Sequence, residues 1–185
     1  LFSDKINTVS PTYSREIQCK EFGFGLEGVL HKRKAGLSGI LNGLDYSLWN
    51  PETDESIAKK YSLNDLEAKY DNKKELQGIC GFVKNKDVPL LGIVSRLAEQ
   101  KGFDILAKCL PDICKMNLQF VILGTGDLIY HKIIQRAAKI YPKVISLHLK
   151  FDNTLAHKIY AGADIFLMPS KYEPCGLGQM ISLRY

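Results

Sequence analysis

The sequence predicts an α/β protein with a doubly wound parallel sheet, and three observations support this fold class. From Leu90 onward, short apolar runs of strand length alternate with longer stretches of helical periodicity. The connections between them are only a few residues long. Polar segments that contain glycine directly follow the apolar runs. This alternation is typical of parallel strands joined by right-handed helical crossovers.

Four apolar runs are expected to form the strands, at residues 90–94, 118–123, 144–149 and 165–168. Helices are expected between them, over about 104–116, 128–138 and 153–160, the last with Asn153 as its N-cap. The residues expected to face the core on the first two helices are Ile105, Leu106, Cys109, Leu110 and Ile113, followed by Ile129, Ile133 and Ile134.

The first 45 residues have a different pattern. Glycine occupies positions 23, 25, 28, 36, 39 and 43, which predicts a turn-rich stretch. A strand is expected to end at 8–10, and Pro11 is expected to begin a helix. Residues 46–86 are polar and charged, with helices expected around 57–60 and 63–80. The apolar residues Phe22, Phe24 and Leu26 are expected to form an exposed patch.

The bulk properties exclude several classes of protein. The 185 residues are 45% hydrophobic and 24% charged, which is ordinary globular composition, and the net charge is +5. No apolar stretch approaches the length of a membrane span, and no dense run of Lys and Arg predicts nucleic-acid binding. Five irregularly spaced cysteines without a CxxC pair argue against a disulfide framework or a zinc site. The four histidines have no metal-ligand spacing.

Two polar segments after apolar runs carry the chemistry. Arg96 and Lys101 follow the first expected strand, and Glu173 follows the fourth. Because ligands of open parallel sheets bind beyond the carboxyl ends of the strands, these three side chains are expected at one crevice. Two cations suit a diphosphate, and a carboxylate suits sugar hydroxyls. The pattern indicates a nucleotide-sugar site; the alternatives are surface cations and a carboxylate favoured by a helix N-terminus.

Three further features add to this site. A helix is expected to begin at Cys175–Gly178, where the amides of Leu177 and Gly178 could bind a phosphate. The turn containing Gly124 and Gly126 lacks the third glycine of a dinucleotide fingerprint, because position 129 is Ile, so NAD binding is not expected. Phe151 follows the third strand and could either stack on a base or cap the core.

Six segments, in the same order, resemble the glycogen and starch synthases. They are TVSPTY (8–13), FGFGL (22–26), GILNGLD (39–45), WNPETD (49–54), SRLAEQKG (95–102) and SKYEPCGLGQ (170–179). The resemblance implies a GT-B fold, with two Rossmann-like domains facing each other across a cleft. Residues 1–45 would end the N-terminal, acceptor-side domain, residues 46–86 would cross over, and residues 87–185 would form a truncated nucleotide-sugar-binding domain.

The resemblance also implies an activity: retaining transfer of glucose from ADP-glucose to the non-reducing end of an α-1,4-glucan. UDP-glucose stays open as the donor, and the alternative is a non-catalytic nucleotide- or glucan-binding relic. No cofactor or metal is implied. Because the chain does not begin with Met, we interpret it as an internal fragment that is inactive by itself. The implied location is the bacterial cytoplasm, or the plastid stroma in a plant.

The family's functional residues can be placed on this chain. The implied catalytic residues are Arg96, Lys101 and Glu173. The implied substrate-binding residues are Asn42, Phe151, Gly124, Gly126, Cys175, Gly176, Leu177 and Gly178. For Asn42 the competing explanation is a purely structural Asn-Gly turn. The implied partners are the nucleotide-sugar donor and the glucan acceptor, without nucleic acid or membrane; the oligomeric state stays open.

Overall fold

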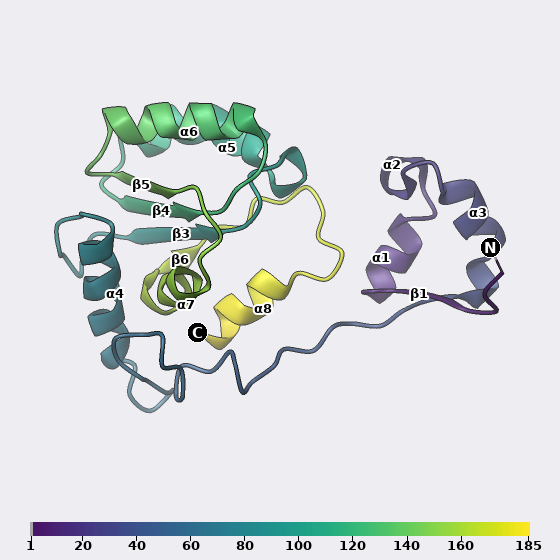
Figure 1. The fold of residues 1–185 in the computed structure, drawn as a ribbon, viewed down its shortest axis with the longest axis horizontal. Helices are drawn as coiled ribbons and strands as arrows, with labels where there is room; N and C mark the ends of the chain where they lie inside the picture. The colour runs from purple at the N-terminus through teal and green to yellow at the C-terminus, as the bar shows by residue number, and fades with distance from the viewer. Residues whose placement is uncertain (1) are drawn as a thin grey trace. The chain divides into compact units, whose positions relative to one another are not determined.

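The computed structural model describes residues 2–185 and contains two compact units (Figure 1). The first unit comprises the chain up to Leu44 together with Tyr172–Leu177. The second comprises Asp45–Lys171 and Gly178–Tyr185. The chain therefore leaves the second unit after Lys171, contributes six residues to the first unit, and returns at Gly178.

A four-stranded parallel sheet forms the centre of the second unit (Figure 1). Its strands are β3 (Leu90–Val94), β4 (Gln119–Leu123), β5 (Ile145–His148) and β6 (Ile165–Phe166). Their order in the sheet is β5-β4-β3-β6, so the direction of winding reverses between β3 and β6. The predicted doubly wound α/β fold is confirmed, and ligands of such sheets bind at the reversal.

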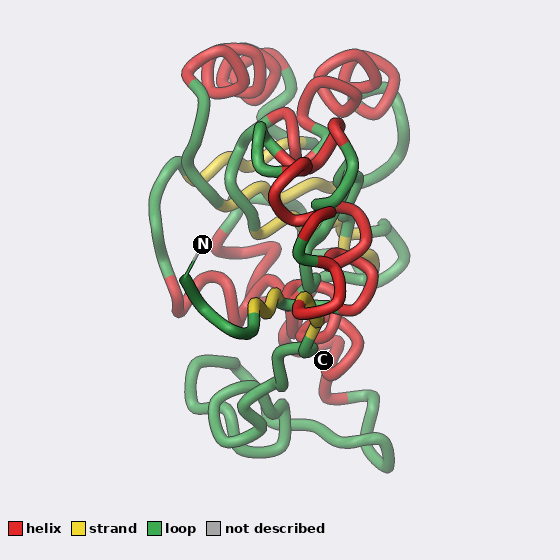
Figure 2. The backbone as a smooth tube through the Cα atoms, turned by 90° about the vertical axis from the view of Figure 1, so that its right-hand side faces the viewer, coloured by secondary structure: helices red, strands yellow, loops and turns green. Residues whose placement is uncertain are grey.

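Helices cover both faces of this sheet. One layer consists of α5 (Phe103–Ile113) and α6 (Leu128–Ile140), which run side by side; Figure 2, turned by 90°, shows them end-on above the strands. The opposite layer contains α4 (Ala68–Ile79) and α7 (Asn153–Gly162), which pack on each other. The last helix is α8 (Leu177–Arg184).

The main core lies between the sheet and the α5–α6 layer. Phe120 and Ile122 of β4 are fully buried against Phe103 of α5 and Ile134 of α6. Leu97, in the loop after β3, is also fully buried. This packing anchors the loop that follows the strand, and with it the start of the segment that carries Arg96.

Several expected elements differ in detail. No helix forms at 57–60, and the helix expected from residue 63 begins only at Ala68. The N-cap of α7 is Asp152, whose side chain accepts a hydrogen bond from the Leu155 amide, and not Asn153. The inward faces were wrong at Ile129, Ile133, Ile105 and Cys109, which are exposed. Tyr130 and Phe103 fill the core instead.

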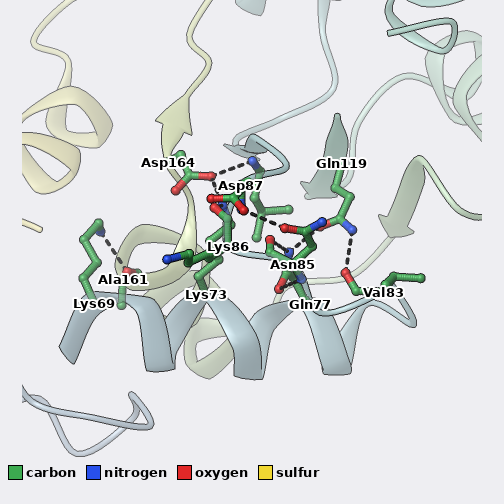
Figure 3. A network of polar contacts seen from close by, with 11 residues as sticks. Lys69, Lys73, Gln77, Val83, Asn85, Lys86, Asp87, Gln119, Ala161 and Asp164 are labelled. Carbon is green, nitrogen blue, oxygen red and sulfur yellow. Dashed lines mark hydrogen bonds and ion pairs between the residues drawn. The ribbon is translucent and has the colours of Figure 1, made fainter. Parts of the chain in front are cut away.

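A buried polar network ties α4 to the sheet (Figure 3). The Gln77 side chain, which is fully buried, donates to the Asn85 carbonyl (2.8 Å) and to Gln119 Oε1 (2.7 Å), and it accepts from the Asn85 amide (3.1 Å). Gln119 in turn donates to the Val83 carbonyl at 2.8 Å. The two buried amide side chains therefore pair with each other and hold the loop at Val83–Asn85 against α4 and β4.

We expect Gln77→Ala to lower the free energy of unfolding by about 2–4 kcal/mol, because it strands buried partners and opens a cavity. The matched control is Gln135→Ala on the exposed face of α6, which should change stability by less than about 0.5 kcal/mol. Urea denaturation followed by circular dichroism measures both. Equal midpoints for the two variants would show that the network does not stabilise the fold.

The first unit contains two short parallel strands, β1 (Ile6–Thr8) and β2 (Leu37–Gly39). Three short helices lie between them: α1 (Pro11–Glu16), α2 (Lys20–Gly23) and α3 (Glu27–Lys32). The helix expected at Pro11 is confirmed, and the Ser10 hydroxyl caps it by accepting from the Tyr13 amide at 2.9 Å.

The expected apolar patch of the first unit is confirmed in part. Phe24 and Leu26 are 73% and 60% exposed. Phe22 is half-buried, because its ring packs edge-on against Tyr172. Among residues 2–185, none of the helices has the length and apolar character needed to cross a membrane.

Candidate functional site

A pocket of about 420 Å³ opens at the carboxyl ends of β3, β4 and β5. All of its lining residues belong to the second unit. Its walls come from the loop after β3, the turn after β4 and the segment between β5 and α7; Trp49, Tyr160 and Ile181 complete it. The pocket therefore lies where a doubly wound sheet holds its ligand.

Arg96 is the cation in the first wall. It is exposed, it lines the pocket, and its guanidinium donates to the Gln100 side chain at 3.1 Å. Lys101 ends a short 3-10 helix, η2 (Glu99–Lys101), and is not among the described residues that line this pocket. The structure thus brings Arg96 to the pocket and places Lys101 one turn further along the same loop.

Gly102 forms the bend that follows Lys101. Its φ is +75°, a left-handed conformation that glycine adopts without strain. A Cβ at this position would lie 2.0 Å from the Pro169 carbonyl oxygen. The bend after Lys101 therefore requires glycine for two reasons, backbone conformation and close packing.

The turn after β4 packs against the loop that carries Arg96. A Cβ on Gly124 would lie 1.8 Å from the Ser95 carbonyl oxygen, and one on Gly126 would lie 2.3 Å from that of Leu97. The Leu97 amide donates to the Thr125 carbonyl at 2.9 Å, and the Asp127 amide donates to Leu97. Gly124 also lines the pocket, whereas Gly126 does not. Both glycines permit close approach of two backbone segments, which explains them without a ligand.

Phe151 is the aromatic residue of the third wall. Its side chain is 94% exposed, so the alternative that it caps the core is wrong. On either side of it, Lys150 and Asp152 form an ion pair of 2.7 Å. The hydrogen bond from Lys150 and the one from the Leu155 amide hold the pKa of the Asp152 carboxyl below its ordinary value. An exposed ring beside a rigid, charged helix start is available to a planar ligand.

The sequence reasoning did not single out Trp49, which also lines the pocket. Its indole stacks on the His157 ring at 4.1 Å between centroids, with the planes 11° apart. His157 is buried and its Nδ1 lies 2.7 Å from the Asp54 carboxylate, which also accepts from the Tyr185 hydroxyl. The available signal was that Trp49 and Asp54 belong to the same motif, WNPETD.

The Asp54 carboxyl is held in its charged form. Burial by itself raises its pKa, but hydrogen bonds from Tyr185, the Ser56 amide and His157 outweigh burial, so the pKa lies below the ordinary value. The group of Asp54, His157 and Trp49 thereby joins the beginning of the second unit to α7. The stacking of Trp49 on His157 holds this lining residue of the pocket in one orientation.

The remaining predicted residues lie elsewhere. Glu173, Cys175, Gly176 and Leu177 belong to the short segment that packs with the first unit. Gly176 has φ +84°, so this position favours glycine. Gly178 lies in α8 of the second unit, where a Cβ would only touch the Tyr160 hydroxyl at 3.5 Å.

Asn42 lies in an exposed, irregular stretch of the first unit. Residues 40–45 form no turn, and neither Asn42 nor Gly43 has a positive φ, so the Asn-Gly turn offered as the structural explanation does not form. Among the described residues, no cluster of three or more His, Cys, Asp or Glu side chains is suited to hold a metal ion.

Comparison with protein families gives two matches. Residues 88–182 match the model described as glycosyl transferases group 1, and residues 1–32 match the starch synthase catalytic domain. A glycogen synthase of Thermosipho melanesiensis is 54% identical over all 185 residues, and one of Thermosipho africanus is 55% identical. The chain spans 38% of the length of each of these curated relatives.

Solved structures agree with these matches. The catalytic domain of starch synthase IV from Arabidopsis thaliana, solved with ADP and acarbose, is similar over the whole chain, with a TM-score of 0.91 and 36% identity; the match covers 38% of that protein. Anabaena HepE, solved with UDP and glucose, matches 99% of the chain and 42% of its own length, with a TM-score of 0.63. At 17% identity, the second likeness shows the fold alone.

Proposed function

This chain belongs to the group 1 glycosyltransferases, within the glycogen and starch synthase family, and on that premise we propose that it supplies the donor site of a glucan synthase. The reaction proposed for the complete protein is transfer of glucose from a nucleoside diphosphate sugar to the non-reducing end of an α-1,4-glucan, with retention of configuration. The observation that carries the proposal is the strand-end pocket, with Arg96 in one wall and Phe151 in another.

Each of the residues predicted for the site has a role in this proposal. Arg96 and Lys101 bind the diphosphate and stabilise the negative charge that develops as it departs. Phe151 stacks on the base, and Gly124 lets the backbone of its turn lie close to the nucleotide. Glu173 acts on the donor glucose, and the amides of Leu177 and Gly178, at the start of α8, receive the distal phosphate. Asn42 helps to position donor or acceptor.

ADP-glucose is the proposed donor. Starch synthase IV, which is similar over the whole chain, was solved with ADP, and this supports adenine as the base. UDP-glucose is the alternative donor, and the transfer assay described below compares the two directly. The cysteines provide indirect support for a cytoplasmic location, because all five carry free thiols in the described residues.

The stacking role of Phe151 predicts a specific loss. Phe151→Ala should weaken ADP binding by about fivefold to hundredfold, because stacking of a base on an aromatic ring contributes about 1–3 kcal/mol. Binding of inorganic pyrophosphate, which has no base, should stay within about twofold. Calorimetric titration measures both ligands.

The control for this prediction is Tyr141→Ala, which removes an exposed ring at the end of α6, beyond Ile140 and outside the pocket. It should leave both affinities unchanged. Equal weakening of ADP and pyrophosphate binding by Phe151→Ala would mean that the ring shapes the pocket without contacting the base.

The proposed activity is tested with the complete protein that contains this chain. Incorporation of radiolabelled glucose into glycogen is measured with ADP-glucose and UDP-glucose in parallel. Transfer from ADP-glucose supports the proposal, and preferential transfer from UDP-glucose would overturn the donor assignment alone. Nucleotide binding without any transfer would favour the alternative, a binding relic of the same fold.

A further inference from the structure

Three aromatic rings of the first unit surround Tyr172, the residue directly before Glu173. The Phe22 ring approaches edge-on at 5.0 Å between centroids, with the planes 60° apart. The Tyr13 ring lies parallel to that of Tyr172 at 6.4 Å, and the Phe24 ring is tilted at the same distance. These separations fall within the range in which aromatic pairs attract each other. We call Tyr13, Phe22, Phe24 and Tyr172 the aromatic clamp.

The backbone beside Phe24 is shaped to hold its ring in this cluster. Phe24 has φ 50° and ψ 39°, and it is the single non-glycine residue with positive φ among residues 2–185. A left-handed residue commonly ends a helix, although a bulky residue is unusual in this position. The Gly25 amide donates to the Glu27 carboxylate at 2.9 Å, which fixes the bend.

Tyr13 is fixed as well, because it lies in α1, whose first turn is capped by Ser10 and begins with Pro11. Phe22 lies in α2, and Phe24 is the residue that ends that helix. The clamp therefore packs side chains of α1 and α2 against the single ring of Tyr172.

The residue before Tyr172 is attached to the other unit. The Lys171 amide donates to the Gln100 carbonyl at 2.9 Å, and its ammonium group lies 3.2 Å from the Asp104 carboxylate and also pairs with Glu99. These partners lie in and next to η2, the 3-10 helix that contains Lys101. The chain thus changes its packing partner between Lys171 and Tyr172, one residue before Glu173.

We propose that Tyr172 is a positioning residue for glucosyl transfer: through the aromatic clamp, its ring holds the backbone that carries the Glu173 carboxylate. This inference rests on the proposed function and deepens it. The consequence is that the placement of Glu173 depends on α1 and α2 of the first unit.

The proposal separates two kinetic quantities. The residues that line the nucleotide pocket belong to the second unit, and so does Gly178 at the start of α8, so loosening the clamp should change nucleotide affinity little. The chemical step should slow, because displacement of a reacting group by about 1 Å can cost on the order of a hundredfold in rate. A residue that served only to stabilise the fold would not produce this separation.

The experiment uses the complete protein, with substitutions of Tyr172 and of its partner Phe22. Tyr172→Leu and Phe22→Leu should each lower kcat by about 10- to 100-fold, with the dissociation constant for ADP within about twofold of wild type. Tyr172→Phe, which keeps the ring, should retain kcat within about threefold. The double variant should be no slower than Tyr172→Leu alone, because both substitutions disrupt the same contact. The control, Tyr70→Leu, removes a half-exposed ring from α4 and should keep wild-type kcat.

A second readout does not depend on activity. Amide hydrogen exchange of residues 172–177 should be faster in Tyr172→Leu than in wild type, and unchanged in Tyr70→Leu. Three results would each overturn the inference. They are an additive loss of kcat in the double variant, an equal loss of kcat in Tyr172→Phe and Tyr172→Leu, and a loss of ADP affinity that parallels the loss of kcat. If the wild-type protein transfers no glucose, both the proposed function and the positioning role are wrong. If the wild-type protein is active and Tyr172→Leu keeps the wild-type kcat, only the positioning role is wrong.

Discussion

Replacing Glu173 with Gln in the complete protein is expected to lower kcat by about 100- to 1000-fold. The change removes the carboxylate charge and keeps the size of the side chain. In the proposed reaction, this charge acts on glucose as it develops positive character, so the interaction is stronger in the transition state than in the bound donor. Loss of one such preorganised group typically costs two to three orders of magnitude in rate. Interactions of this kind affect kcat and not ground-state binding.

Steady-state kinetics with ADP-glucose and calorimetry with ADP measure the two quantities separately. ADP affinity should stay within about threefold of wild type, since the nucleotide pocket contains no residue of the 172–177 segment. Glu55→Gln is the matched control, because this carboxylate is 86% exposed and pairs only with Lys60 among the described residues. A variant that raised KM and kept kcat would show that Glu173 merely binds the donor.

Replacing Arg96 with Ala is expected to have the largest effect on nucleotide affinity. The guanidinium lines the pocket and, in the proposed complex, makes a charge-assisted contact with the diphosphate. Such contacts contribute about 1.5–3 kcal/mol, which corresponds to a loss of about 10-fold to 150-fold in ADP affinity. Transfer should fall further than binding, because charge on the diphosphate increases as the glycosidic bond breaks.

A graded series sharpens this prediction. Arg96→Lys keeps the charge and loses the planar pair of donors, so it should fall between wild type and Arg96→Ala. The matched control is Arg136→Ala, an exposed arginine of α6 outside the pocket. Affinity for ADP that is equal in wild type and Arg96→Ala would remove Arg96 from the site.

The central strands β3 and β4 could be predicted from the sequence because they are buried on both faces. Runs such as Leu90–Val94 and Gln119–Leu123 are almost continuously apolar, and they stand out from the periodic helices between them. Helix faces were less predictable. Tyr130 enters the core in place of Ile129 and Ile133, because the position of α6 on α5 decides which side is buried.

The helix expected at 57–60 does not form, because a side chain distant in the sequence pairs with the backbone there. The Asn72 side chain accepts from the Lys59 amide at 3.1 Å and donates to the Lys59 carbonyl at 2.7 Å. The Asp54 carboxylate accepts from the Ser56 amide at 2.8 Å. The buried Asn72 side chain, 13 residues away, thus satisfies the Lys59 backbone groups that a helix would otherwise pair, and no local periodicity reveals this.

Parts of the site could not be predicted from the sequence for the same reason. Arg96 and Phe151 could be placed because each directly follows a strand, and the ends of parallel strands meet. The support of the pocket by Trp49 depends on the pairing of Asp54 with His157, which are 103 residues apart. The aromatic clamp likewise joins Tyr13 to Tyr172 across the chain. Contacts of this kind leave no local pattern in a single sequence.

The central claim is that the strand-end pocket of the second unit holds the nucleoside diphosphate of a glucosyl donor. Hydrogen exchange of the complete protein, with and without ADP, tests it most directly. The account predicts slower exchange in three segments, 95–97, 123–126 and 151–155. It predicts no change in a groove between α5 and α6, which is lined by Leu110 and Pro111 on one side and by Ile133 and Ala137 on the other. Protection confined to that groove, or none in the three segments at saturating ADP, would contradict the account.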